Sequence, residues 1–155
     1  MPEALIEKSD KPRIVILGGG FAGLELAKSL RHAPVQVVLI DRQNFHTFQP
    51  LLYQVATAGI EPSSILYPFR KIFDDQPNFY FRMASALRVD TDKQILETSI
   101  GFLEYDYLVV AMGATTNFYG NAEIQKKAIA IKSVEDALAL RNTILTNFEK
   151  ALQIK

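Results

Sequence analysis

Residues 13–23 read Arg-Ile-Val-Ile-Leu-Gly-Gly-Gly-Phe-Ala-Gly, and residues 36–41 read Gln-Val-Val-Leu-Ile-Asp. The apolar run before the glycines is typical of a parallel strand that is buried on both faces. Gly18, Gly20 and Gly23 then give the spacing G-x-G-x-x-G. These glycines permit a tight turn, the close approach of a pyrophosphate and the close packing of a helix on the strand. We therefore predict a strand, a phosphate-binding turn and a helix.

The helix and the next acidic residue indicate what the turn binds. A helix that begins near Ala22 directs its free N–H groups and the positive end of its dipole at an anion. A second apolar strand, residues 37–40, ends in Asp41, about twenty positions beyond the turn, where a carboxylate accepts hydrogen bonds from both hydroxyls of an adenosine ribose. These features predict a site for an adenine dinucleotide.

Composition sets the class of the protein. The chain has 155 residues, of which 48% are hydrophobic, so we expect a globular domain that is too short for two complete nucleotide-binding domains. Seventeen basic and seventeen acidic residues cancel, which gives no electrostatic reason to expect nucleic acid or an anionic membrane as a partner. The sequence has no cysteine, which excludes a disulfide and a redox-active dithiol in this stretch. The polar start, residues 1–11, is no signal peptide, so we expect a cytoplasmic location.

The rest of the chain predicts short helices, strands and one long helix. After a polar and aromatic loop at 42–50, we expect helices at 51–58 and 68–75, strands at 80–89, 94–98 and 107–110, a tight turn at 90–93, and a long helix that a capping box at 133–136 opens. Met112 and Gly113 follow the last strand and form a second glycine turn, which we place at the same edge of the parallel sheet. The long helix carries an apolar stripe, which indicates either missing neighbours or packing on the sheet.

Three separated motifs closely resemble the N-terminal part of type II NADH:quinone oxidoreductases. They are Gly-Gly-Gly-Phe-Ala-Gly-Leu-Glu-Leu-Ala at 18–27, Val-Leu-Ile-Asp-Arg-Gln-Asn-Phe-His-Thr-Phe-Gln-Pro-Leu-Leu-Tyr-Gln-Val-Ala-Thr-Ala-Gly at 38–59, and Asp-Tyr-Leu-Val-Val-Ala-Met-Gly-Ala-Thr-Thr-Asn-Phe at 106–118. The resemblance implies an α/β, Rossmann-like, FAD/NAD(P)-binding three-layer fold with a parallel sheet and a small antiparallel β-meander, here truncated.

The resemblance implies that residues of several segments hold FAD. Gly18, Gly20 and Gly23 would form the pyrophosphate turn, with backbone N–H groups from Phe21 and Ala22. The other implied contacts are Asp41 at the adenosine ribose, Arg42 at the adenine end, Pro50 and Leu51 along the ribityl and isoalloxazine groups, the backbone of Ala86 at the adenine, and Met112 and Gly113 in the second FAD turn. The family usually has Ala-Thr-Gly in that turn, so a threonine hydroxyl is absent here.

The resemblance also implies a division of the chain and a reaction. Residues 1–12 would be a flexible lead-in, residues 13–120 the FAD-binding domain, and residues 121–155 a connector and helix leading to an absent NADH-binding domain. The full-length enzyme of the respiratory chain would pass two electrons from its substrate NADH through FAD to a membrane quinone. NADH, quinone and the inner face of the cell membrane would all be contacted by absent parts, and a homodimer is left open. The fragment alone is expected to be inactive, because hydride transfer requires both rings in one site.

Alternatives to this flavoenzyme stay open. A stand-alone NAD-binding module would explain the first glycine turn and Asp41 but not Met112 and Gly113, and a fold relic without a ligand is a further class. Another FAD-dependent pyridine nucleotide oxidoreductase is also open, although the absence of cysteine weighs against disulfide reductases and sulfide:quinone reductases. We assign no catalytic residue and no metal site, because His32 and His46 have no clustered carboxylates or thiols beside them.

Overall fold

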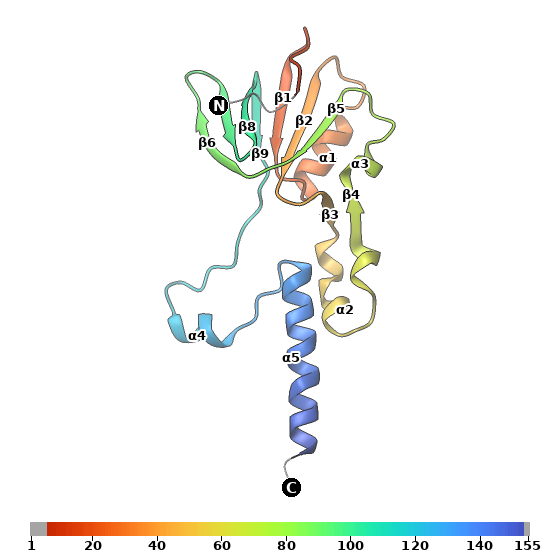
Figure 1. Cartoon of the computed structure of the whole chain (residues 1–155), viewed down its shortest axis with the longest axis vertical. Coiled ribbons are helices and arrows are strands. Elements are labelled where there is room, and N and C mark those ends of the chain that lie inside the picture. The colour runs from red at the N-terminus through yellow and green to blue at the C-terminus, as the bar shows by residue number, and fades with distance from the viewer. Residues whose placement is uncertain (1–5, 154–155) are drawn as a thin grey trace. The chain divides into compact units, whose positions relative to one another are not determined.

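The computed structural model describes residues 6–153, which form two compact units (Figure 1). The first unit lies within Met1–His46 and Tyr67–Gly113, and the second within Thr47–Leu66 and Ala114–Lys155. No helix in the described part of the chain combines the length and the apolar character that crossing a bilayer requires.

A four-stranded parallel sheet forms the centre of the first unit (Figure 1). Its order is β5 (Phe79–Met83), β2 (Gln36–Asp41), β1 (Arg13–Leu17) and β9 (Tyr107–Val110). Because β1 lies between β2 and β9, the turn that follows β1 lies between the loops that follow those two strands. The topology therefore gathers three loops at one edge of the sheet, where open α/β sheets bind their ligands.

Two different layers cover the faces of this sheet. Alternate strand residues pack on one face against α1 (Phe21–Ser29) and α3 (Phe69–Ile72), in a core that contains Ile16, Val37, Leu39 and Phe81. The intervening residues pack on the other face against an antiparallel sheet of β6 (Ala86–Asp90), β7 (Ile95–Thr98) and β8 (Gly101–Glu104), in a core that contains Val15, Leu17, Val38 and Ile40. The predicted three-layer α/β fold with a small β-meander is confirmed.

The predicted strand over 80–89 is wrong as a single element. The chain leaves the parallel sheet after Met83 and enters the antiparallel sheet at Ala86, so β5 and β6 belong to different sheets. No glycine or proline separates the two halves, and the pattern therefore conceals the break. The sequence reading also omitted β8, which pairs with β7 through a tight hairpin in which Gly101 has a φ of 129°, a backbone conformation that favours glycine. The tight turn between β6 and β7 is confirmed.

The start of the chain contributes to the core. The flexible lead-in over residues 1–12 stays a prediction, and within its described part Ile6 is buried in the core that the meander covers. The fully buried guanidinium of Arg13 donates to the carbonyl of Ile6 (2.9 Å) and to the side chain of Gln36 (2.5 Å), and the Gln36 amide donates to the carbonyl of Glu7 (2.8 Å). These bonds provide partners that a buried charge requires. Residues 1–5 lie outside the described part.

The second unit is built on two helices. α2 (Leu52–Ala56), shorter than the predicted helix at 51–58, packs on α5 (Val134–Leu152) around the fully buried Ala137. The unit also contains the 3-10 turns η1 (Gln49–Leu51) and η2 (Pro62–Ile65) and the short α4 (Ala122–Lys127). Two short strands, β3 (Phe45–Thr47) and β4 (Leu66–Pro68), pair with each other where the chain passes between the units. β3 lies inside the predicted loop at 42–50.

The long helix α5 confirms the predicted capping box, and the exposure of its side chains shows which part of the predicted apolar stripe is buried. The capping box is present, because the Ser133 hydroxyl accepts from the backbone of Asp136 and the Asp136 carboxylate accepts from the backbone of Ser133. Along the predicted apolar stripe, Leu138 is partly buried, whereas Phe148 is 67% and Leu152 is 79% exposed. Within the second unit, the second half of the stripe is therefore largely exposed.

Candidate functional site

The two glycine turns lie against each other at the carboxyl edge of the parallel sheet. Gly18 has a φ of 99°, and a Cβ there would lie 2.5 Å from the carbonyl oxygen of Ala111 and 2.9 Å from the Cα of Met112. Its N–H donates to the carbonyl of Ile40 at 2.8 Å. Gly113 has a φ of 71° and open space around its Cα. The expected meeting of the two turns at one edge is confirmed.

The three glycines of the motif differ in what surrounds them. A Cβ at Gly23 would lie 1.9 Å from the carbonyl oxygen of Gly18, so this glycine lets α1 pack closely on β1. A Cβ at Gly20 would meet nothing within 4 Å. Gly20 is also the N-cap of α1, and no side chain of residues 6–153 caps that helix end. The amino end of α1, which carries the positive end of the helix dipole, therefore has no side-chain cap and can attract an anion.

Asp41 is oriented by the turn itself. Its Oδ2 accepts from the N–H of Gly19 at 2.6 Å, and its Oδ1 accepts from the N–H of Gln43 at 2.8 Å. An ionised carboxylate has about four lone-pair positions, so each oxygen can still accept a further donor. The carboxylate thus both supports the glycine turn and presents acceptors at the edge of the sheet.

Sequence reasoning assigned no role to Gly19, Phe69 and His46, which support the turn. Gly19 occupies a variable position of the motif, yet a Cβ there would lie 2.0 Å from the ring of Phe69. The carbonyl of Gly19 accepts from Nδ1–H of His46 at 2.9 Å, and His46 is only 4% exposed. The ring of Phe21 meets the imidazole edge-on, with centroids 5.1 Å apart. The sequence offered one signal for these contacts: position 19 is a glycine although the motif does not require one there.

The remaining predicted site residues lie in several elements. Arg42 follows Asp41 on an exposed bend, Ala86 is exposed at the start of β6, and Met112 is 64% exposed. These three belong to the first unit, as do the glycine turns. Pro50 and Leu51 belong to η1 of the second unit, where Pro50 is exposed and Leu51 is half-buried. Their contacts with a cofactor stay predictions.

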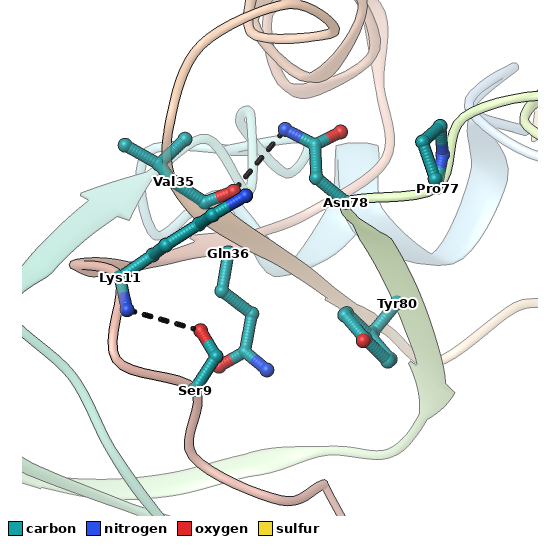
Figure 2. Close-up of a pocket in the computed structure, with 7 residues that line it drawn as sticks. All are labelled: Ser9, Lys11, Val35, Gln36, Pro77, Asn78 and Tyr80. Carbon is teal, nitrogen blue, oxygen red and sulfur yellow. Dashed lines mark hydrogen bonds between the residues drawn. The ribbon is translucent and has the colours of Figure 1, made fainter.

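A hollow of about 180 Å³ lies at the opposite edge of the same sheet (Figure 2). Asn78 lines it and donates to the carbonyls of Leu30, Ala33 and Val35, which fastens the loop that enters β2. This edge carries the amino ends of the strands, whereas ligands of open α/β sheets bind beyond the carboxyl ends. We therefore assign this hollow to the packing of the loops. Nowhere within residues 6–153 do three potential metal ligands gather.

Together, a central parallel strand, an open glycine turn, an uncapped helix and a carboxylate at the end of the next strand define a dinucleotide-binding domain of the Rossmann type. Residues 12–151 match the pyridine nucleotide-disulphide oxidoreductase family, and the chain belongs to that family.

Relatives of known function narrow the comparison. The chain is 41% identical over 143 residues to the type II NADH:quinone oxidoreductase Ndh of Mycobacterium tuberculosis. The aligned region covers 90% of this chain and 31% of that protein. It is 31% identical over 157 residues to the mitochondrial external alternative NAD(P)H-ubiquinone oxidoreductase B1 of Solanum tuberosum, covering 94% of this chain and 27% of that protein. The predicted resemblance to type II NADH:quinone oxidoreductases is confirmed, and the chain spans less than a third of the length of these relatives.

Solved structures share the fold. NDH2 from Plasmodium falciparum in complex with NADH superposes with a TM-score of 0.82 at 26% identity, over 92% of this chain and 30% of that one. The sulfide:quinone oxidoreductase from Aquifex aeolicus gives a TM-score of 0.81 at 27% identity, over 89% of this chain and 32% of that one. Both similarities extend across nearly the whole chain.

Proposed function

We propose that this chain supplies the FAD-binding part of an NADH:quinone oxidoreductase, in which two electrons pass from NADH through FAD to a quinone. The observation that carries the proposal is the open space at Gly20, between Gly18 and Gly23, which are both packed against backbone. Of the three glycines of the motif, Gly20 is the one whose Cα faces open space, and a pyrophosphate can occupy that space. The names of the relatives supply the substrates of the reaction.

The residues at the edge of the sheet fit FAD. Gly20 and the backbone N–H groups of Phe21 and Ala22 would hold the pyrophosphate, because they lie at the start of α1, where the helix dipole is positive. The carboxylate of Asp41, which the N–H of Gly19 already orients toward the turn, would accept hydrogen bonds from the ribose hydroxyls. FAD, when bound, supplies the redox chemistry, and the chain supplies binding and orientation.

The other contacts complete the proposed cradle. Arg42 would lie at the adenine end, and the backbone of Ala86 would meet the adenine. Met112 and Gly113 would form the second turn, in which Gly113 is surrounded by open space, so that backbone can approach the cofactor without the usual threonine. The residues proposed along the ribityl and isoalloxazine groups are Pro50 and Leu51.

The whole enzyme is part of the same proposal. NADH and quinone would bind to segments beyond this chain, and the chain alone would be inactive because both reacting rings must meet in one site. A cytoplasmic location, attachment to the inner face of the cell membrane, and a homodimer rest on the resemblance to the family alone.

The visible absorption spectrum tests the proposal. The purified chain is incubated with FAD, the excess is removed, and retained flavin bands are expected. A chain that stays colourless, both alone and when extended to the full length of its relatives, would overturn the assignment. Retention of NAD without FAD would instead favour the stand-alone nicotinamide module.

The replacement Asp41→Ala is expected to weaken FAD binding by about tenfold or more, which is about 1.4 kcal/mol, because both half-buried acceptors of the ribose hydroxyls are lost. Arg42→Ala is expected to change the affinity by less than about threefold, because an exposed arginine contributes little. Titration of FAD, followed by quenching of its fluorescence, gives both constants. Asp41→Asn separates charge from hydrogen bonding, since it retains one acceptor oxygen. Equal affinities of the two alanine variants would exclude the ribose role of Asp41.

A further inference from the structure

We propose that His46 is a positioning residue of the anion site: it restrains the peptide between Gly19 and Gly20 so that the N–H of Gly20 faces away from the imidazole and stays available to a phosphate. This inference rests on the proposed function, because the anion in question is the pyrophosphate of FAD. It assigns a task to a buried histidine that the glycine motif does not include.

The geometry of a single peptide plane carries the first step. The described residues contain no cis peptide bond, so the carbonyl of Gly19 and the N–H of Gly20 point in opposite directions across one trans peptide. Nδ1–H of His46 donates to that carbonyl at 2.9 Å. The N–H of Gly20 is therefore turned away from His46, at an exposed residue with open space beside its Cα.

The second step is that this peptide requires a restraint. Gly19 and Gly20 both lack a Cβ, so the peptide between them can rotate between two orientations at low conformational cost. The rotated orientation would present the carbonyl oxygen of Gly19 to the phosphate, and two negatively polarised oxygens would repel each other. A hydrogen bond to the carbonyl opposes that rotation.

The third step is that the neighbouring groups are already fixed. The preceding peptide is held by Asp41, whose Oδ2 accepts from the N–H of Gly19 at 2.6 Å. The ring of Phe69 lies against the Cα of Gly19 and leaves no room for a side chain. His46 restrains the carbonyl of Gly19, which is the remaining polar group of that residue. The imidazole itself is held by burial and by the edge-on contact with Phe21.

The hydrogen bond also determines the tautomer of His46. A carbonyl oxygen only accepts, so Nδ1 must carry a proton. An asparagine side chain places its N–H donor near the position of Nδ1, whereas a glutamine side chain places its donor near the position of Nε2. The pair His46→Asn and His46→Gln therefore separates the proposed hydrogen bond from loss of the ring, which both replacements share.

The test compares the FAD affinity and the melting temperature of the two variants. His46→Gln is expected to bind FAD about tenfold or more weakly than the unmutated chain, and His46→Asn within about threefold of it, at similar melting temperatures. Equal losses of affinity in both variants, or no loss in His46→Gln, would overturn the inference. Absence of FAD binding by the unmutated chain and by its extended form would instead overturn the proposed function.

A measurement without ligand decides the hydrogen bond separately. Long-range proton–nitrogen correlation spectra of the neutral imidazole are expected to show the proton of His46 on Nδ1 and none on Nε2. The opposite tautomer would overturn the restraint, whether or not the chain binds FAD.

Discussion

Replacing Gly20 with valine is expected to abolish FAD binding while leaving the chain folded. Gly20 has a φ of −68° and a ψ of −166°, which a residue with a side chain adopts without strain. A Cβ there meets nothing within 4 Å, so the valine would fill the space that we assign to the pyrophosphate. We expect the FAD affinity to fall by about a hundredfold or more, which corresponds to about 2.7 kcal/mol.

Two measurements are needed on Gly20→Val. Titration with FAD gives the affinity, and a thermal melt shows that the fold persists, with a loss of at most about 1 kcal/mol from the poorer helix cap. Gly20→Ala serves as a graded control, because its single methyl group occupies less of the same space and should weaken binding less. Undiminished FAD binding by Gly20→Val would show that this turn is not the pyrophosphate site.

Replacing Gly23 with alanine is expected to have the opposite pattern, a loss of stability without direct obstruction of the cofactor. Its Cβ would lie 1.9 Å from the carbonyl oxygen of Gly18. Both partners are backbone, so no side chain can rotate to relieve the contact, and α1 must move from β1. Overpacking of this kind costs about 1–3 kcal/mol and occasionally more, whereas the better helix propensity of alanine returns about 1 kcal/mol. Because a contact of 1.9 Å between backbone atoms lies at the upper end of that range, we expect a net destabilisation of about 2 kcal/mol.

Urea unfolding of Gly23→Ala measures this loss directly. Gly59→Ala is the matched control, because its Cβ would find its nearest neighbour at 3.4 Å, an ordinary van der Waals distance. A stability of Gly23→Ala equal to that of the control would mean that the close approach of α1 to β1 is not required. The two glycine variants together separate the part of the motif that builds the fold from the part that faces the ligand.

The sequence predicted what is local. The strand, glycine turn, helix and second strand follow one another without interruption, and each has its own period or its own glycine. The break between β5 and β6 was not predictable in this way, because β5 pairs with β2, which lies far back in the chain, whereas β6 pairs with the next strand, β7. No glycine or proline marks the break in the sequence.

The site shows the same limit. Gly18, Gly20, Gly23 and Asp41 have a fixed spacing and could be found from it. The hydrogen bond from His46 to Gly19 depends on the direction in which the short strand β3 presents its middle residue, and three residues carry too little period to predict that direction.

The order of the parallel sheet has a consequence for biosynthesis. On one side Ile14 pairs with Val37, which the ribosome supplies soon afterwards, but on the other side it pairs with Tyr107. The edge of β1 that pairs with β9 therefore stays unpaired until the ribosome has made residue 107 and those that follow it. Closing so long a loop is slow, and nascent chains with exposed apolar strands are the ones that chaperones retain. Of the two flanks of β1, the one that faces β9 is thus enclosed much later than the one that faces β2.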